Sequence, residues 1–279
     1  MSTPLPPDEP MPPLTRSGLT QGRPPRNRHL AWCVAVALLA SGPAAAAAPA
    51  ATAASPPSGC RAAVHDGARY TVCTFDLRRY AIRLFHADRE GRPFGSLQQL
   101  VRAPEGARLA MAMNAGMYHH DLSPVGLYVE DGQERKALNR SGGPGNFHMR
   151  PNGVFYVAGG QAGVLETGAY AKRRPKAAFA TQSGPMLVID GRLHPRFSEE
   201  GPSRKIRNGV GVQSGNQVVF AISDEPVSFG AFARLFRDQL GCRNALFLDG
   251  SISALHAPDL GRTDISFKPL GPIVAAVAR

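Results

Sequence analysis

The stretch FGAFARLFRDQLGCRNALFLDGSIS, residues 229–253, predicts a helix followed by a buried strand. Apolar side chains recur at helical spacing from Phe229 to Leu240, and Ser228 is placed to cap the start of this helix. Gly241 is placed to end it. The apolar run Ala245–Leu248 that comes next has the length of a strand.

The predicted strand stops at an acid, Asp249, which Gly250 and Ser251 follow. A carboxylate at the end of a buried strand, beside a flexible turn, is common at the rim of a binding pocket. The alternative is an ordinary Asp-Gly turn that only ends the strand. The polar residues at other strand ends bear on the choice between the two.

The chain on either side of this stretch consists mainly of short strands and turns. Alternating apolar and polar residues, or uninterrupted apolar runs, predict the strands, and several Asp-Gly turns predict hairpins. A short helix is predicted at residues 96–101 with Ser96 as its cap. Many strands with few helices predict an α+β fold, a single domain of mixed β-sheets flanked by helices. The predicted strands are residues 70–77, 80–85, 108–113, 126–133 with an internal turn, 153–158, 163–166, 177–182, 186–190, 192–193, 208–213, 217–222, 245–248 and 272–278.

Residues 1–54 are predicted to be a signal peptide and its Ala/Pro-rich cleavage region, which leaves residues 55–279 as the folded domain. A basic segment precedes an uncharged apolar run at residues 30–40, and small residues follow it, which is the pattern of a secretory signal. A membrane-spanning helix needs about 20 apolar residues, so this run is too short for a stable span. The sequence therefore predicts an exported protein, periplasmic or extracellular.

The protein is basic, because 32 Lys and Arg face 21 Asp and Glu, for a net charge of +11. Removal of residues 1–54 would leave a net charge of +9, spread along the chain in short runs such as Lys172-Arg173-Arg174. This balance favours anionic partners such as phosphorylated glycans. Nucleic acid is disfavoured as a partner, because the chain has no basic stripe interleaved with aromatic residues and no nucleic-acid-binding motif.

Three cysteines follow the predicted signal. In an oxidising compartment Cys60 and Cys73 could pair across the first strand turn, which would leave Cys242 free and buried beside a helix end. A zinc site of Cys and His ligands is the alternative, but the spacing fits no zinc pattern.

Polar residues mixed with glycine occur at four of the predicted strand ends. Each block alone favours a turn. Because strand ends from different parts of a sheet tend to converge on one rim, we expect the blocks to form one polar site. The blocks are Asn114-Ala115-Gly116, Gln182-Ser183-Gly184, Arg207-Asn208-Gly209 and Asp249-Gly250-Ser251, and Gly-containing loops add Asn146 and Asn152.

Several familiar catalytic patterns are missing, among them the nucleophile elbow, the zinc-protease helix, the P-loop and the dinucleotide fingerprint. Ser183 could still be the nucleophile of an amidase or esterase. His119-His120-Asp121 could bind a metal, although adjacent residues of a strand point to opposite faces. The sequence requires no cofactor. Asp249 and a bound phosphate could hold a divalent cation, but no ligand spacing demands one.

Five segments of the chain carry a family resemblance. They are NAGMYHHDLSPVGLYVEDG, GNFHMRPNGVFYV, ATQSGPMLVIDG, RNGVGV and FLDGSISAL, in this order within roughly residues 70–279. Together they resemble successive blocks of the bacterial phosphodiester glycosidase family. The resemblance implies a secreted or envelope enzyme that hydrolyses a sugar 1-phosphodiester on a single mixed α/β domain. Matched by position, it implies a polar site of Asn114, Ser183-Gly184, Arg207-Asn208 and Asp249-Gly250.

The chain departs from this family at one point that bears on its substrate. The family's best-known member has a more Gly-rich stretch after the aspartate, where this chain has Gly250-Ser251-Ile252-Ser253. The fold expected from the resemblance is unaffected, whereas the identity of the sugar and of the phosphate carrier stays open.

The chemistry of a sugar phosphodiester assigns roles to two of these residues. Its cleavage at the anomeric carbon expels a phosphate monoester, a weak base that needs less general-acid help than the leaving groups of ordinary glycosidases. Arg207 suits the binding of the phosphate, because a guanidinium can contact two of its oxygens. Asp249 suits the role of base or nucleophile.

We therefore predict a hydrolase of sugar 1-phosphodiesters with Arg207 and Asp249 as its catalytic residues. The alternative is a non-catalytic binder of anionic envelope polysaccharide. The predicted substrate-binding residues are Asn114, Gly116, Asn146, Asn152, Gln182, Ser183, Gly184, Asn208, Gly250 and Ser251.

Overall fold

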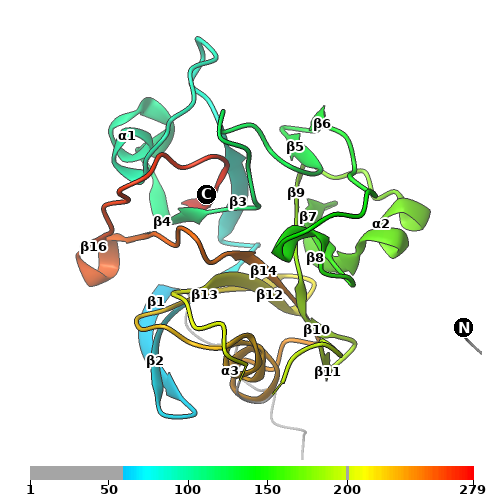
Figure 1. Ribbon diagram of the computed structural model, residues 1–279. Coiled ribbons are helices and arrows are strands. Elements are labelled where there is room, and N and C mark those ends of the chain that lie inside the picture. The colour runs from blue at the N-terminus through cyan, green and yellow to red at the C-terminus, as the bar shows by residue number, and fades with distance from the viewer. Residues whose placement is uncertain (1–58, 199–200) are drawn as a thin grey trace, which may run out of the picture. The chain divides into compact units, whose positions relative to one another are not determined.

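The computed structural model describes residues 59–198 and 201–279, so the predicted signal peptide and cleavage region lie outside the described residues. Three β-sheets make up the fold, and each carries a helix on its outer face (Figure 1). This arrangement confirms the predicted α+β class with sheets flanked by helices. The strand pairings within the three sheets are antiparallel.

The large sheet has seven strands in the order β1-β2-β13-β12-β14-β10-β11. Both of its faces are buried, because alternate residues of each strand point to opposite sides. Phe220 and Ile222 of β13 pack into the core shared with the other two sheets, whereas Val219 and Ala221 pack toward the helix on the other face. The strands are β1 (Gly59–His65), β2 (Ala68–Asp76), β10 (Met186–Ile189), β11 (Arg192–Leu193), β12 (Asn208–Ser214), β13 (Gln217–Ser223) and β14 (Asn244–Asp249).

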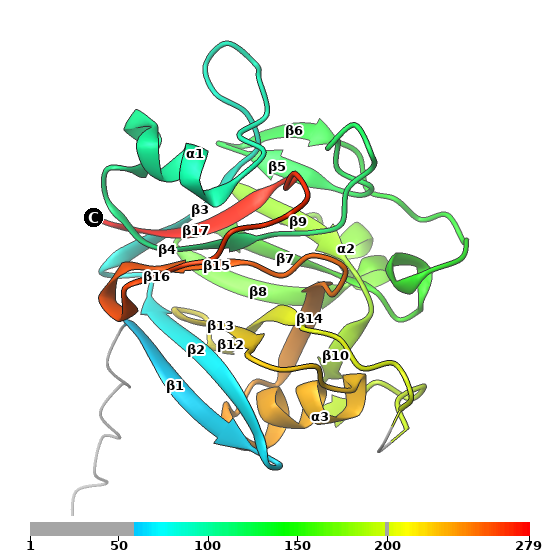
Figure 2. The same cartoon turned by 60° about the vertical axis from the view of Figure 1, so that its left-hand side comes forward.

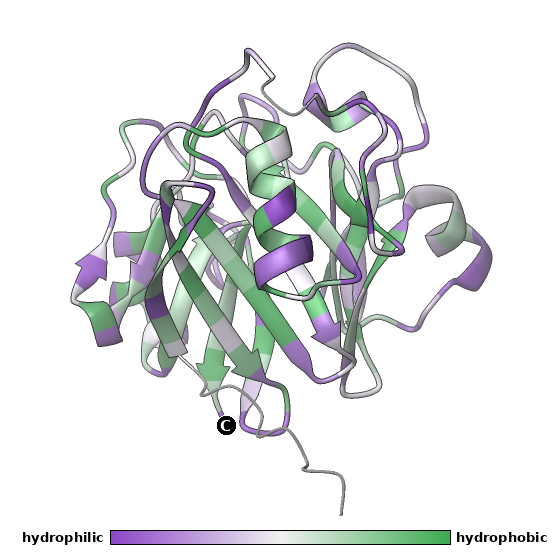
Figure 3. Ribbon diagram, turned by 90° about the horizontal axis from the view of Figure 1, so that it is seen from below, coloured by the Kyte–Doolittle hydropathy of each residue, from purple (hydrophilic) through white to green (hydrophobic). Residues whose placement is uncertain are grey.

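Helix α3 (Phe229–Arg234) and the π-helical turn that continues it (Leu235–Gln239) cover the outer face of the large sheet (Figures 1 and 3). Phe232 is fully buried against this face. The Ser228 side chain caps the helix by accepting a hydrogen bond of 3.1 Å from the amide of Ala231. The helix predicted from the opening stretch of sequence is therefore confirmed.

The second sheet has five strands in the order β16-β15-β4-β17-β3, with β4 in the centre as its apolar sequence predicts (Figure 2). Leu97 and Leu100 of helix α1 (Leu97–Arg102) pack on its outer face. Ser96 caps this helix, as predicted, by accepting a hydrogen bond from the amide of Gln99. The strands are β3 (Tyr80–Phe85), β4 (Leu109–Asn114), β15 (Leu255–Ala257), β16 (Arg262–Thr263) and β17 (Ile273–Ala278).

The third sheet has five strands in the order β6-β5-β9-β7-β8. Helix α2 (Thr167–Arg173) lies on its outer face, where Tyr170 packs edge-on against Tyr156. Glu166 caps the start of this helix, because its carboxylate accepts a hydrogen bond from the amide of Ala169. The strands are β5 (Tyr128–Glu130), β6 (Gln133–Lys136), β7 (Gly153–Ala158), β8 (Gln161–Glu166) and β9 (Phe179–Ser183).

The other described helices are short turns. None of the helices in the described part of the chain is long and apolar enough to cross a membrane. The turns are η1 (Pro104–Gly106), η2 (Asn146–His148) and η4 (Pro258–Leu260).

A disulfide joins Cys60 of β1 to Cys73 of β2, which lie opposite each other in the register of the two strands. The proposed pairing across the first strand turn is thus present in the structure. Cys242 is free and buried, and this burial raises the pKa of its thiol to about 12.

Candidate active site

Asp249 is the last residue of β14, a strand in the interior of the large sheet between β12 and β10. The chain turns at once, and Oδ1 of Asp249 accepts hydrogen bonds from the amides of Gly250 (2.6 Å) and Ser251 (2.7 Å). The residue is 7% exposed, and this burial raises the pKa of the carboxyl although the amides act in the opposite direction. Asp249 therefore keeps its proton to a higher pH than an ordinary aspartate.

Two buried asparagines hold both ends of the turn that follows Asp249. Asn208 accepts a hydrogen bond from the Asp249 amide through Oδ1 (2.9 Å), and its Nδ2 donates to the carbonyl oxygen of Asn114 (2.8 Å). Asn114 donates from Nδ2 to the carbonyl of Ile252 (2.7 Å) and accepts from the amide of Ala254 (2.9 Å). The ends of β4, β12 and β14 therefore converge as expected, but both asparagine side chains face the protein backbone.

Ser183 joins the same network from β9. Its Oγ donates to the carbonyl of Leu248 (2.8 Å), and the residue is fully buried. A buried hydroxyl that donates to a carbonyl is poorly placed to attack a substrate, so the arrangement disfavours Ser183 as an esterase or amidase nucleophile.

Gln182 and Asn152 support the loops around the site. Gln182 accepts hydrogen bonds from the amides of Leu127 (3.0 Å) and Asn139 (2.9 Å). Asn152 donates to the carbonyl of Phe147 (2.8 Å). Both amides are buried, and their hydrogen bonds fix neighbouring backbone.

Two of the predicted glycines allow segments of the chain to approach each other closely. A Cβ at Gly116 would lie 2.4 Å from the carbonyl oxygen of Gln182, and a Cβ at Gly184 would lie 2.6 Å from the Cβ of Asn152. Side chains at these positions would push the supporting residues apart, so both glycines serve packing within this network.

Arg207 lies directly before β12 and is 1% exposed. Its Nε donates to the carbonyl of Val227 (2.9 Å), its Nη2 donates to the carbonyl of Ser203 (2.7 Å), and Cζ lies 3.6 Å from the ring centroid of Phe229. Burial lowers the pKa of this guanidinium to about 10. The third nitrogen, Nη1, lies beside Gly250, where an added Cβ would be 3.4 Å away.

Arg207 has no carboxylate partner within ion-pair distance among the described residues. A buried cation without a counter-charge is unusual, because the desolvation of the charge is not offset by a nearby carboxylate. Arg207 lies next to the turn that carries Asp249, because its Nη1 is beside Gly250.

A cavity of about 870 Å³ opens in front of Asp249. We call the network of Asn114, Ser183, Asn208 and the 249–254 turn its floor. Loops supply the other lining residues, which we call its wall. The cavity-lining residues are Met117, Tyr118, His119, His120, Leu122, Val125, Pro144, Gly145, Asn146, Phe147, His148, Asp249, Ser251, Ile252, Lys268 and Pro269.

Hydrogen bonds tie the wall loops to neighbouring segments, and one wall residue, Tyr118, is close enough to Asp249 to feel its charge. The hydroxyl of Tyr118 donates to the carbonyl of Pro269 (2.9 Å), which connects two of the loops. Burial, and then the negative charge of Asp249, raise the pKa of Tyr118 to about 12. A ring nitrogen of His148, Nδ1, lies 3.1 Å from the carbonyl oxygen of Ser141.

The structure thus divides the predicted site into two groups. Of the predicted residues, Asp249, Ser251 and Asn146 line the cavity, whereas the others belong to the floor or support the floor and the loops around it. The residues that the prediction omitted are chiefly Tyr118, His148 and Lys268. The first two belong to polar blocks that also contain predicted residues, so their position in the sequence carried a signal, whereas no local pattern marked Lys268.

The described residues contain no group of three or more His, Cys, Asp or Glu side chains that could hold a metal ion. His119 and His120 are both exposed at the cavity wall, so the alternative of a metal site at these histidines gains no further ligands from the fold.

Comparison with known proteins gives the family. The model of the phosphodiester glycosidase family matches residues 107–260, which include the floor, Asp249 and the wall apart from Lys268 and Pro269. The chain belongs to this family. The uncharacterized protein YigE of Escherichia coli K12 is 39% identical over 176 residues, which are 63% of this chain and 69% of that protein.

Solved structures share the fold. The catalytic domain of zebrafish N-acetylglucosamine-1-phosphodiester alpha-N-acetylglucosaminidase, auto-inhibited by its pro-peptide, aligns with a TM-score of 0.54 and 14% identity over 79% of this chain and 82% of that one. A hypothetical protein from Synechocystis aligns with a TM-score of 0.52 and 16% identity over 79% of this chain and 61% of its own. At these identities the likeness shows a common fold and no more.

Proposed function

We propose that this phosphodiester glycosidase family member hydrolyses sugar 1-phosphodiesters of envelope or extracellular glycans in the cavity above Asp249. The observation that supports this proposal most strongly is the Asp249 carboxylate, which is buried and has a raised pKa at the floor of the cavity. The wall brings cationic or protonatable side chains, His119, His120, His148 and Lys268, to the same cavity. An anionic diester and a carboxylate that acts on its sugar match this distribution of charge.

Asp249 is the carboxylate through which the proposed reaction proceeds, because it is the only Asp or Glu among the described residues that line the cavity. As a base, it accepts a proton from water while the water oxygen bonds to the anomeric carbon and the bond to the phosphate oxygen breaks. As a nucleophile, it bonds to that carbon first, and water then releases the sugar. In both routes the phosphate leaves as a monoester, which explains why one carboxylate suffices.

The phosphodiester has two sources of positive charge in this proposal. Lys268 at the wall is exposed and meets the incoming phosphate first. Nη1 of Arg207, beside Gly250, supplies a fixed and desolvated charge from behind the floor. The absence of a carboxylate partner for Arg207 in the described structure supports this role, because a bound phosphate would provide the missing counter-charge.

The apolar part of the wall suits a sugar ring. Tyr118 and Phe147 offer ring surface, and Asn146 and Ser251 offer hydrogen-bonding groups within the same cavity. Rings combined with polar groups are a common means of binding carbohydrate-sized ligands.

We further propose that the protein acts outside the cytoplasm. The disulfide between Cys60 and Cys73 supports this location, since such bonds persist in oxidising compartments.

The test is hydrolysis of UDP-N-acetylglucosamine and of a chromogenic sugar phosphodiester by wild type, Asp249→Asn and Asp190→Asn. The asparagine oxygen can still accept from the Gly250 and Ser251 amides, so Asp249→Asn keeps the turn while it removes the carboxylate. We expect its turnover to fall by about 10²–10⁴-fold. Asp190→Asn, at an exposed hairpin, should retain wild-type turnover.

The outcomes separate the proposal from its alternative. Normal turnover by Asp249→Asn would refute the role of the carboxylate. Saturable binding of anionic polysaccharide by the wild type, with no release of sugar from any phosphodiester, would favour a non-catalytic binder.

A further inference from the structure

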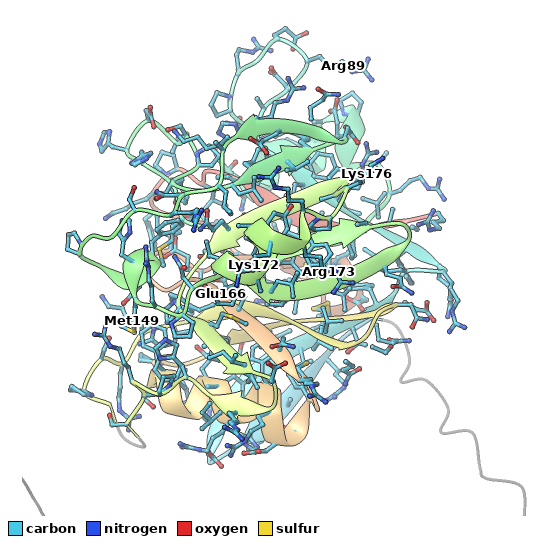
Figure 4. The ribbon with its side chains drawn as sticks, turned by 90° about the vertical axis from the view of Figure 1, so that its right-hand side faces the viewer. Arg89, Met149, Glu166, Lys172, Arg173 and Lys176 are labelled. Carbon is cyan, nitrogen blue, oxygen red and sulfur yellow. A yellow bond between two sulfur atoms is a disulfide. The ribbon has the colours of Figure 1, made fainter. Side chains whose placement is uncertain are left out.

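Exposed cations gather on the third sheet and on helix α2, outside the cavity. They come from strand β6, from the loop after it, and from α2 with the segment that follows. Figure 4 shows Lys172, Arg173 and Lys176 on one side of the molecule. We call this set the basic face; its members are Arg135, Lys136, Arg140, Lys172, Arg173, Arg174 and Lys176.

The parts of the basic face are neighbours in space. Arg140 and Arg174 line one hollow of about 420 Å³ together with Tyr170 and Glu134. Lys176 lines the adjoining hollow of about 480 Å³, which shares Tyr170 and Glu134 with the first. Glu134 is the only acid in the described lining of either hollow, so over the two hollows together three cations face one acid.

The charges of the basic face are compensated only in part within the described structure, chiefly by Glu134. None of its seven members belongs to an ion pair between described residues. Some arginines elsewhere are paired, for example Arg262 with Asp224 (2.7 Å) and Asp264 (2.9 Å). A surface on which like charges outnumber the neighbouring acids has a positive potential that attracts polyanions.

One loop connects the basic face to the cavity. The Nη2 of Arg150 donates to the carbonyls of Arg140 and Ser141, and Nδ1 of His148 contacts the same Ser141 oxygen. His148 lines the cavity, whereas Arg140 belongs to the basic face. Positive and protonatable groups therefore follow one another from the cavity wall to α2.

We propose that the basic face binds additional phosphates of a polymeric substrate, a glycan in which sugar phosphodiesters repeat along the chain. This inference rests on the proposed function, because it places one diester of the polymer in the cavity and its neighbours along the loop and the basic face. Single-stranded nucleic acid would also be a polyanion, but it is bound by exposed aromatic rings that stack on bases. The large exposed apolar residues of the described structure, Val64, Leu260, Ile265 and Phe267, lie outside the basic face.

The experiment compares two synthetic probes, a decamer of N-acetylglucosamine joined by 1,6-phosphodiesters and the matching dimer. The variant is Lys172→Gln/Arg173→Gln/Arg174→Gln, and the matched control is Arg61→Gln/Arg79→Gln/Arg102→Gln. The control removes the same charge from exposed arginines of β1, the turn before β3 and helix α1, none of which belongs to an ion pair between described residues. For binding measurements without turnover, each set of substitutions is also introduced into the Asp249→Asn protein.

We expect the α2 variant to bind the decamer at least about tenfold more weakly, with a smaller loss of affinity on addition of salt. Its turnover of the dimer should equal that of the wild type, and the control should bind the decamer like the wild type.

Equal affinity of the α2 variant and the control for the decamer would overturn the inference. So would an oligothymidylate of the same charge that binds more tightly than the decamer with the same dependence on α2. Failure of the proposed function looks different, since neither probe would then be hydrolysed whatever its affinity.

Discussion

The floor and the wall of the cavity are built in different ways. In the floor, Asn114, Asn208 and Ser183 are fully buried, and their side chains make hydrogen bonds within the protein. The wall is made of loop side chains, and some of them, such as Lys268 and His120, are exposed. The floor therefore fixes the position of Asp249, and the wall is left to recognise the substrate. Substitutions in the floor should change stability and activity together, whereas substitutions in the wall should change binding alone.

The substitution Asn208→Ala is the strongest test of the distinction between floor and wall. The change leaves the amide of Asp249 and the carbonyl of Asn114 without a partner in a dry interior. We expect the free energy of unfolding to fall by about 2–3 kcal/mol, with a large loss of turnover, because the carboxylate is no longer held. Urea denaturation and turnover of a chromogenic sugar phosphodiester are the measurements.

Gln133→Ala, on exposed strand β6, is the matched control for the loss of an amide. It should change the free energy of unfolding by less than about 0.5 kcal/mol. If Asn208→Ala kept the stability of this control, the floor would not be the support that its hydrogen bonds indicate.

A second comparison contrasts the two cations assigned to phosphate. Arg207→Lys keeps the charge but loses the planar group that bonds to Val227 and Ser203 and stacks on Phe229. We expect a lower Tm and a fall in kcat/KM of about tenfold or more. Lys268→Gln, at the wall, should raise KM several-fold and leave both kcat and Tm unchanged.

Salt distinguishes the two positions further. An exposed charge is screened at physiological ionic strength, so added salt should reduce the difference in KM between Lys268→Gln and wild type. The defect of Arg207→Lys should persist, because the guanidinium is buried. A Lys268→Gln variant with a lowered Tm, or an Arg207→Lys variant with full activity, would remove the distinction between floor and wall.

The same contrast explains which parts of the molecule the sequence could predict. Hairpins at Asp131-Gly132 and Asp190-Gly191 were predictable, because the turn residues adopt positive φ between alternating strands. Helix α3 was predictable from its apolar spacing and its cap. Helix α2 was not, since its segment contains Gly168 and the helix depends on packing of Tyr170 against Tyr156 across the third sheet. Strands β15 and β16 are too short to show a period.

The candidate site was also predictable from the sequence only in part. The convergence of strand ends follows from local pattern, because each polar block lies at the start or the end of a strand. The direction of each side chain does not follow from local pattern, and Asn114 and Asn208 turn inward to bond with backbone that only the folded chain brings near. Wall residues such as Lys268 reach the cavity through long loops, whose course depends on tertiary contacts such as the one between Tyr118 and Pro269.

The smallest expected effect is the change in the stability of the protein when Asp249 is replaced. Asp249 belongs to the floor but faces the cavity. Its folded pKa is raised by burial, so the folded state binds the proton more tightly than the unfolded chain, in which an aspartate has a pKa of about 3.9. The stabilisation from this proton is complete below the unfolded pKa and is lost as the pH rises through the folded value.

At neutral pH the charged carboxylate of Asp249 therefore destabilises the folded state, and a neutral asparagine at this position avoids that destabilisation. We expect Asp249→Asn to have a higher Tm than wild type at pH 7.5, and the difference to shrink as the pH falls through the raised folded pKa towards about 4, where the carboxyl is protonated in both states. Asp190→Asn, at an exposed hairpin, measures how the loss of one negative charge alters this cationic protein in general. If Asp249→Asn were instead less stable than wild type at pH 7.5, the carboxylate would be a structural cap of its turn, and the floor would hold Asp249 for stability and not for chemistry.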